Sequence, residues 1–100
     1  MADLKLSREA RADLEAVRQV GIRDHGPIAA EAHLRGFERL FQLLREQPYA
    51  GQERPEFDRD ICSLAHRPHR ILYTVRADRV LIVRVIHHAR DVRAVLGTDR

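Results

Sequence analysis

The chain has 100 residues, of which 44% are hydrophobic and 33% are charged, and its formal net charge is +3. This composition indicates one folded domain with a modest core, and no apolar run approaches the roughly 18 residues that a membrane-spanning helix needs. The single cysteine excludes an internal disulfide, and the chain begins without an apolar signal core, so we expect a cytoplasmic protein.

The first half of the chain predicts a short strand followed by two helices. Residues 3–6 alternate weakly, as a strand does, and Ser7 is a suitable N-cap for a helix that begins directly after it. Gly26 and Pro27 are expected to end this helix and begin another, because glycine tolerates a left-handed turn and proline suits the first helical position. Pro48 ends the second helix, since it disfavours helix in the residue before it. The apolar stripe of that helix consists of Ala30, Leu34, Phe37, Leu40, Phe41 and Leu44.

The second half of the chain predicts a sheet. Residues 49–60 form a polar loop, and three β-branched runs follow at 61–66, 69–75 and 80–87. Short polar breaks separate these runs, which is typical of a meander of antiparallel strands. A short final helix is expected at residues 91–96, with Gly97 as its stop.

The predicted fold is a two-layer α+β domain over residues 1–100. An N-terminal strand and an antiparallel helical hairpin are expected to pack on a three- to four-stranded, mainly antiparallel sheet. One face of this sheet is the only surface in the chain that can bury the apolar stripe of the helices. We therefore expect the other face, with part of the arginine and histidine content, to stay open to a partner.

Positive charge is concentrated in the sheet-forming half. Residues 61–100 hold eight arginines against three acidic side chains, a net charge of +5, whereas residues 1–60 hold ten basic and twelve acidic side chains, a net charge of −2. Arginine offers a planar fork of donors that suits carboxylates and phosphates alike, so this bias suggests one functional surface, which nucleic acid or an acidic protein could bind. Genomic base composition is the alternative explanation for the preference of arginine over lysine. The candidate partner-binding residues are Arg67, Arg70, Arg84, His87, Arg90 and Arg93.

The cysteine and the histidines favour structural roles over catalysis or metal binding. Cys62, His66 and His69 have a suggestive spacing, but a structural zinc site normally takes four ligands. His87 and His88 are adjacent, and adjacent residues of a strand point to opposite faces of the sheet. We therefore predict no metal and no cofactor, and we interpret Cys62 as a core residue.

Three polar side chains are also interpreted as structural. Tyr73 lies within a strand and is expected to pack with its hydroxyl group satisfied. Asp91 is expected to cap the final helix. Arg54 is expected to form a solvated ion pair with an acidic neighbour, which is Glu53, Glu56 or Asp58.

Four pieces of the chain, taken in order, resemble the ParE-type toxins of bacterial toxin–antitoxin pairs. The order and spacing of the pieces carry the resemblance, which extends over about residues 4–96. The pieces are the start of the first helix at 6–14, the loop at 48–57 with Arg-Pro-Glu-Phe, the strand His-Arg-Ile-Leu-Tyr at 69–73, and Arg-Val-Ile-His-His-Ala-Arg-Asp at 84–91. His88 and Phe57 depart from the glycine and leucine that are usual in the family.

The resemblance implies the RelE/ParE fold and the toxin component of a type II toxin–antitoxin system. Such a toxin is expected to inhibit DNA gyrase by binding rather than by bond chemistry, with no catalytic residues of its own. A cognate ParD-like antitoxin is the second expected partner. Contact with nucleic acid is expected only indirectly, through gyrase or through a complex of the antitoxin with its operator.

Two alternatives stay open, because one fold hosts both branches of the superfamily. The first is a RelE-like, ribosome-dependent endoribonuclease, whose pattern Arg70 and Arg90 match. Ile61 and Ser63 stand where RelE carries paired lysines, and Leu96 stands near its tyrosine. Histidine could replace the missing acid and base, and the candidates are His66, His69, His87 and His88. The second alternative is an inactive module that only binds an antitoxin.

Overall fold

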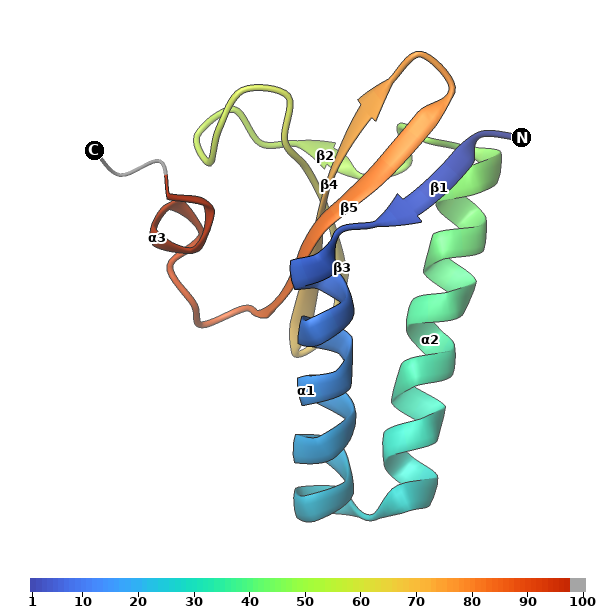
Figure 1. Ribbon diagram of the computed structural model, residues 1–100, viewed down its shortest axis with the longest axis vertical. Helices are drawn as coiled ribbons and strands as arrows, with labels where there is room; N and C mark the ends of the chain where they lie inside the picture. The colour runs from blue at the N-terminus through green and yellow to red at the C-terminus, as the bar shows by residue number, and fades with distance from the viewer. Residues whose placement is uncertain (98–100) are drawn as a thin grey trace.

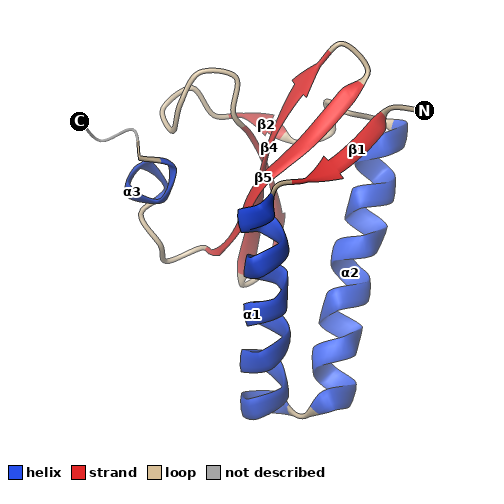
Figure 2. Ribbon diagram, viewed as in Figure 1, coloured by secondary structure: helices blue, strands red, loops and turns tan. Residues whose placement is uncertain are grey.

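The computed structural model describes residues 1–97 and has two layers, a helical hairpin and a sheet (Figures 1 and 2). In chain order the elements are β1 (Asp3–Leu6), α1 (Arg8–His25), α2 (Pro27–Glu46), β2 (Gln52–Glu53), β3 (Cys62–His66), β4 (His69–Arg76), β5 (Arg79–His87) and α3 (Val92–Leu96). The predicted α+β class is confirmed. Asp99 and Arg100, which enter the charge count above, lie outside the described residues.

The sheet has five strands in the order β1-β5-β4-β3-β2. Strand β1 runs parallel to β5, and the other neighbouring strands are antiparallel. The prediction of three to four strands missed β2, which has two residues and pairs only with Cys62 and Ser63 of β3. So short a strand leaves no alternating pattern within a polar loop.

Local sequence signals set the ends of the helices as expected. The amide of Ala10 donates to Ser7 Oγ at 2.9 Å, which caps α1, and Gly26 has a φ of 87° between α1 and α2. Asp91 caps α3, because its side chain accepts from the amide of Arg93. Within residues 1–97 no helix combines the length and apolarity that crossing a membrane requires.

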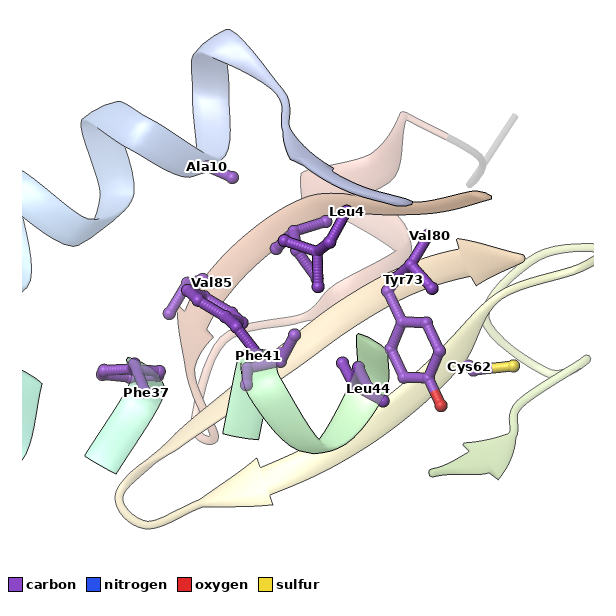
Figure 3. Close-up of a cluster of buried hydrophobic side chains, with 11 residues drawn as sticks. Leu4, Ala10, Phe37, Phe41, Leu44, Cys62, Tyr73, Val80 and Val85 are labelled. Atoms are coloured by element: carbon purple, nitrogen blue, oxygen red, sulfur yellow. The ribbon is translucent and has the colours of Figure 1, made fainter. Parts of the chain in front are cut away.

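The main core lies between the helical hairpin and one face of the sheet (Figure 3). Phe37 and Leu44 of α2 and Tyr73 of β4 are at most 1% exposed, which confirms the predicted stripe and the packing role of Tyr73. The hydroxyl oxygen of Tyr73 accepts from the amide of Gly51 at 2.9 Å, so a buried polar group is satisfied. Cys62 is buried in the same cluster, as predicted.

The far face of the sheet, which is the face turned away from α1 and α2, carries a second apolar cluster. Its buried members are Ile61, Leu72, Ile86 and Val92, and Phe57, Val83, Val95 and Leu96 pack against them. The loop before β3 and helix α3 therefore cover part of this face, and Figure 1 shows α3 away from the hairpin, near that loop. The expectation of a fully open face was wrong, because apolar residues of these two segments needed burial.

A bulge in β5 changes which side chains face the helices. Leu72 pairs with Arg84 and Tyr73 with Ile82, so Val83 is the extra residue in β5. Val80 and Ile82 belong to the main core before the bulge, and Val85 belongs to it afterwards. The side chains of β5 that face the helices thus shift from even-numbered to odd-numbered positions. This shift determines which side chains at the C-terminal end of β5 face the helices.

We expect Tyr73→Phe to lower the free energy of unfolding by about 1–2 kcal/mol, because the amide of Gly51 loses its buried acceptor. Tyr49→Phe is the matched control, since Tyr49 is 68% exposed and should change stability by less than about 0.5 kcal/mol. Urea unfolding monitored by circular dichroism measures both variants. Equal stabilities of Tyr73→Phe and the unsubstituted chain would contradict this role of the hydroxyl group.

Candidate partner-binding site

A cleft of about 430 Å³ opens beside β3, where β2 has ended and the strand has no outer neighbour. We call it the arginine cleft. Its polar walls come from Arg54 before β3, Arg67 in the β3–β4 turn, Arg70 of β4 and two histidines, His69 and His88. No carboxylate is among the described residues that line it. The cleft therefore favours anionic groups.

An aromatic ring orients two of these arginines. The guanidinium carbon of Arg54 lies 4.5 Å from the centroid of the Phe57 ring, and that of Arg70 lies 5.6 Å from it. Arg54 also pairs with Glu56 at 2.7 Å, as one of the expected ion pairs, and donates to Ser63 Oγ at 3.2 Å. Arg70 donates to the carbonyl oxygen of His88 at 3.3 Å. These contacts hold the planar groups at the wall of the cleft.

A second and more apolar depression of about 580 Å³ lies between the helical hairpin and the C-terminal end of β5. We call it the hairpin groove. Val17 and Val20 of α1 and Ala29 of α2 line it on one side, and His87 and Arg90 line it on the other. This combination suits an apolar segment that carries an acidic group near one end.

Arg84 belongs to neither surface. Its Nε and Nη2 donate to the two carboxylate oxygens of Asp13 in α1 at 2.8 and 2.9 Å, and the amide of Val85 donates to the same carboxylate at 2.9 Å. The side chains of Arg84 and Asp13 are only 22% and 15% exposed. The fork of Arg84 is therefore engaged within the fold.

The six predicted binding residues are thus divided by the structure. Arg67 and Arg70 line the arginine cleft, and His87 and Arg90 line the hairpin groove. Arg93 lies on α3, outside both linings. The bulge at Val83 contributes to this division, because after it the odd-numbered positions of β5, and so His87, face the helices.

Sequence reasoning missed Arg54 and Ser63 as parts of the cleft. Arg54 was recognised only as a surface ion-pair residue, and its position in the Arg-Pro-Glu-Phe loop was the available signal. Ser63 is 8% exposed and faces Arg54, but its position in an apolar strand gave no indication of this contact. Contacts between a loop and a strand depend on tertiary packing, which a periodic pattern does not encode.

Two titratable groups near these surfaces are uncharged at neutral pH. Burial, together with the neighbouring imidazoles, lowers the pKa of His69 to about 4. Burial raises the pKa of the Cys62 thiol, which opposes the thiolate form that a nucleophile requires. Across residues 1–97 no three side chains among His, Cys, Asp and Glu are placed to hold a metal ion. The chemical groups that the arrangement offers are guanidinium forks, which suit anionic groups.

The family described as "ParE toxin of type II toxin-antitoxin system, parDE" matches residues 4–92 of the chain. The chain belongs to this ParE toxin family. Toxin ParE1 of Caulobacter vibrioides is 30% identical over 97 residues, which cover 97% of this chain and 100% of that protein. Toxin ParE3 of the same organism is 25% identical over 91 residues and covers 91% of each chain.

Solved structures agree with this assignment. A chain of the chromosomal ParDE TA system from P. aeruginosa superposes with a TM-score of 0.75 at 25% identity, covering 87% of this chain and 96% of that one. A mutant toxin from Helicobacter pylori has a TM-score of 0.60 at 17% identity over 89% of this chain and 97% of that one, and shows the shared fold. The expectation of a ParE-like toxin of a type II system is confirmed.

We expect Arg84→Ala to destabilise this ParE-family chain by about 2–3 kcal/mol, because Asp13 would keep a poorly exposed charge without its fork. Arg67→Ala is the control and should change stability by less than about 0.5 kcal/mol, since Arg67 is exposed in a turn. Chemical denaturation measures both. Similar losses in the two variants would contradict a structural role that is particular to Arg84.

Proposed function

We propose that this toxin inhibits DNA gyrase by binding it through the arginine cleft and that a ParD-type antitoxin neutralises it. The observation that carries the proposal is the cleft itself, in which Arg67 and Arg70 present guanidinium groups and none of the described lining residues carries a carboxylate, whereas Arg54 is already paired with Glu56. Forks of this kind bind carboxylates of a partner protein with defined geometry. Membership in the ParE family supports gyrase as that partner.

The cleft favours binding over RNA cleavage, because cleavage needs a positioned base and a positioned acid. His69 is uncharged at neutral pH and its Nδ1 lies 3.0 Å from Nε2 of His33, and Nδ1 of His88 lies 2.8 Å from the carbonyl oxygen of Pro68. Ile61 and Leu96, which stand at or near positions where RelE has polar groups, pack in the far-face cluster. These contacts support a toxin that acts by binding and does not itself catalyse cleavage of RNA.

We further propose that the antitoxin occupies the hairpin groove with an apolar segment. Val20 is 46% exposed at the wall of the groove, so a partner can remove additional apolar surface from water there. His87 and Arg90 would meet an acidic residue of that segment. The structural likeness to a chain of a ParDE system, which is named for both components, supports an antitoxin of the ParD type.

We expect the purified chain to inhibit supercoiling by gyrase in vitro, and Arg67→Ala/Arg70→Ala to need at least about tenfold more protein for the same inhibition. The loss of two charge-assisted contacts is the physical reason. Arg76→Ala/Arg79→Ala is the matched control, because these exposed arginines flank the β4–β5 turn outside the cleft, and it should inhibit like the unsubstituted chain.

Three outcomes would replace the proposal. Equal inhibition by Arg67→Ala/Arg70→Ala and by the control variant would show that gyrase does not bind at the cleft. Intact supercoiling together with cleavage of messenger RNA on ribosomes would establish the nuclease alternative. The absence of both activities with normal antitoxin binding would establish an inactive module.

We expect Val20→Asp to weaken binding of the cognate antitoxin by more than about tenfold, because a carboxylate would be buried in an apolar contact. Ile28→Asp is the matched control, since Ile28 is 85% exposed on α2 and does not line the groove. Isothermal titration calorimetry measures both affinities. Equal affinities of the two variants would place the antitoxin elsewhere.

A further inference from the structure

Five of the six histidines of the chain gather between α2 and the end of the sheet at the β3–β4 turn. The ring of His33 from α2 stacks on that of His66 from β3, with centroids 4.2 Å apart and planes 12° apart. The ring of His69 lies 5.1 Å from that of His33 and 5.7 Å from that of His87. We call these residues the imidazole seam, which consists of His33, His66, His69, His87 and His88.

Hydrogen bonds through the seam join the helix layer to the sheet layer. His33 Nε2 and His69 Nδ1 lie 3.0 Å apart, so one ring donates and the other accepts. His66 Nε2 donates to the backbone carbonyl oxygen of His33 at 2.8 Å, because a carbonyl can only accept. Neutral imidazoles satisfy both contacts, whereas protonation of the accepting ring of the His33–His69 pair would place two N–H donors against each other.

A glycine in the middle of α2 makes room for the seam. A Cβ atom on Gly36 would lie 2.3 Å from Cε1 and 2.4 Å from Nε2 of His66. Glycine is disfavoured inside a helix, and here its missing side chain lets an imidazole ring lie directly against the helix backbone. The ring of His66 therefore packs against α2 twice, on the backbone at Gly36 and on the ring of His33.

The surroundings of the seam offer little compensation for added positive charge. The carboxylates that line the adjoining hairpin groove are Asp13 and Asp24, and they are already paired with Arg84 and Arg23. The cations nearby are Arg67 and Arg70 at the arginine cleft and Arg90 at the groove, and the imidazole of His25 lies at the end of α1. Burial, followed by the effect of the other imidazoles, lowers the pKa of both His33 and His69.

We propose that the imidazole seam is a proton-operated latch, which holds the β3–β4 turn against α2 while its rings are neutral and releases the turn when they become charged. His69 lines both the arginine cleft and the hairpin groove, so release alters the two surfaces together. The latch consists only of side chains of this protein, so it operates whether or not gyrase is the target. It makes the accessibility of both surfaces depend on pH.

The direction of this dependence follows from the lowered pKa of His69. Above pH 6.5 the ring is neutral in the closed and the open form, so its protonation favours neither. As the pH falls from 6.5 toward 4, the open form takes up a proton that the closed form does not, and the closed form loses stability. We therefore expect the opening constant of the turn to rise about thirtyfold between pH 7.5 and pH 5.

Amide hydrogen exchange of the β3–β4 hairpin tests the latch, with rates corrected for the intrinsic effect of pH. The critical variant is His33→Gln/His69→Asn, in which side-chain amides replace Nε2 of His33 and Nδ1 of His69 without a titratable group. This variant should lose most of the thirtyfold rise. His25→Gln is the control, because this exposed histidine lies outside the seam, and it should keep the full rise.

A rise of less than about threefold in the unsubstituted chain, or the same rise in the double variant, would overturn the latch. Should the double variant fail to fold, the ring titration of His69 in the unsubstituted chain decides by NMR. A midpoint near 4 that accompanies increasing exchange supports the latch, and a midpoint near 6.5 overturns it. Neither measurement uses gyrase or the antitoxin, so their outcomes are independent of the proposed function.

Discussion

The carboxylate of Asp13 joins the helical hairpin to the sheet at the place where β5 loses its outer strand. Strand β1 accompanies β5 only as far as Ile82. Beyond that point, Asp13 accepts from the amide of Val85 and from the fork of Arg84, and Ser7 Oγ donates to the carbonyl oxygen of Val83 at 2.7 Å. Side chains at the start of α1 thus form hydrogen bonds with backbone groups of β5 that a neighbouring strand would otherwise have paired.

This anchoring lies next to the bulge of β5, after which the odd-numbered positions of the strand face the helices. Arg70 and its cleft lie at the far side of β4, whereas His87 and Arg90 turn toward the hairpin groove. A toxin that must meet both a target and an antitoxin gains from two such surfaces, because each can be tuned separately. They remain physically connected through His69, which lines both.

Most of the architecture could be predicted from the sequence because its signals are local. Ser7, Gly26 and Asp91 act at the element ends where their side chains or backbone freedom predicted them. The bulge at Val83 could not be predicted. Residues 80–87 are apolar at odd-numbered and even-numbered positions alike, so their pattern does not reveal that one residue is unpaired. The cover of the far face depends on apolar residues in a loop and in a five-residue helix, whose patterns are too short to identify a face.

The candidate site was predicted only in part for the same reason. Arginine content and its position identified Arg67 and Arg70, because charge is visible in composition. The gathering of His33 with His66 and His69 depends on how α2 lies across the sheet, and these residues are 33 and 36 positions from His33 in the chain. Arg84 was assigned by charge alone, and charge does not distinguish an exposed fork from one that Asp13 holds.

The pairing of β1 with β5 has a consequence for synthesis of the protein. Residues 3–6 leave the ribosome well before residues 79–82, which form their strand partner. The apolar stripe of the helical hairpin therefore has no complete sheet to pack against until β5 has emerged from the ribosome. A nascent chain of this topology cannot complete its sheet, or the two candidate surfaces beside it, until β5 has been released.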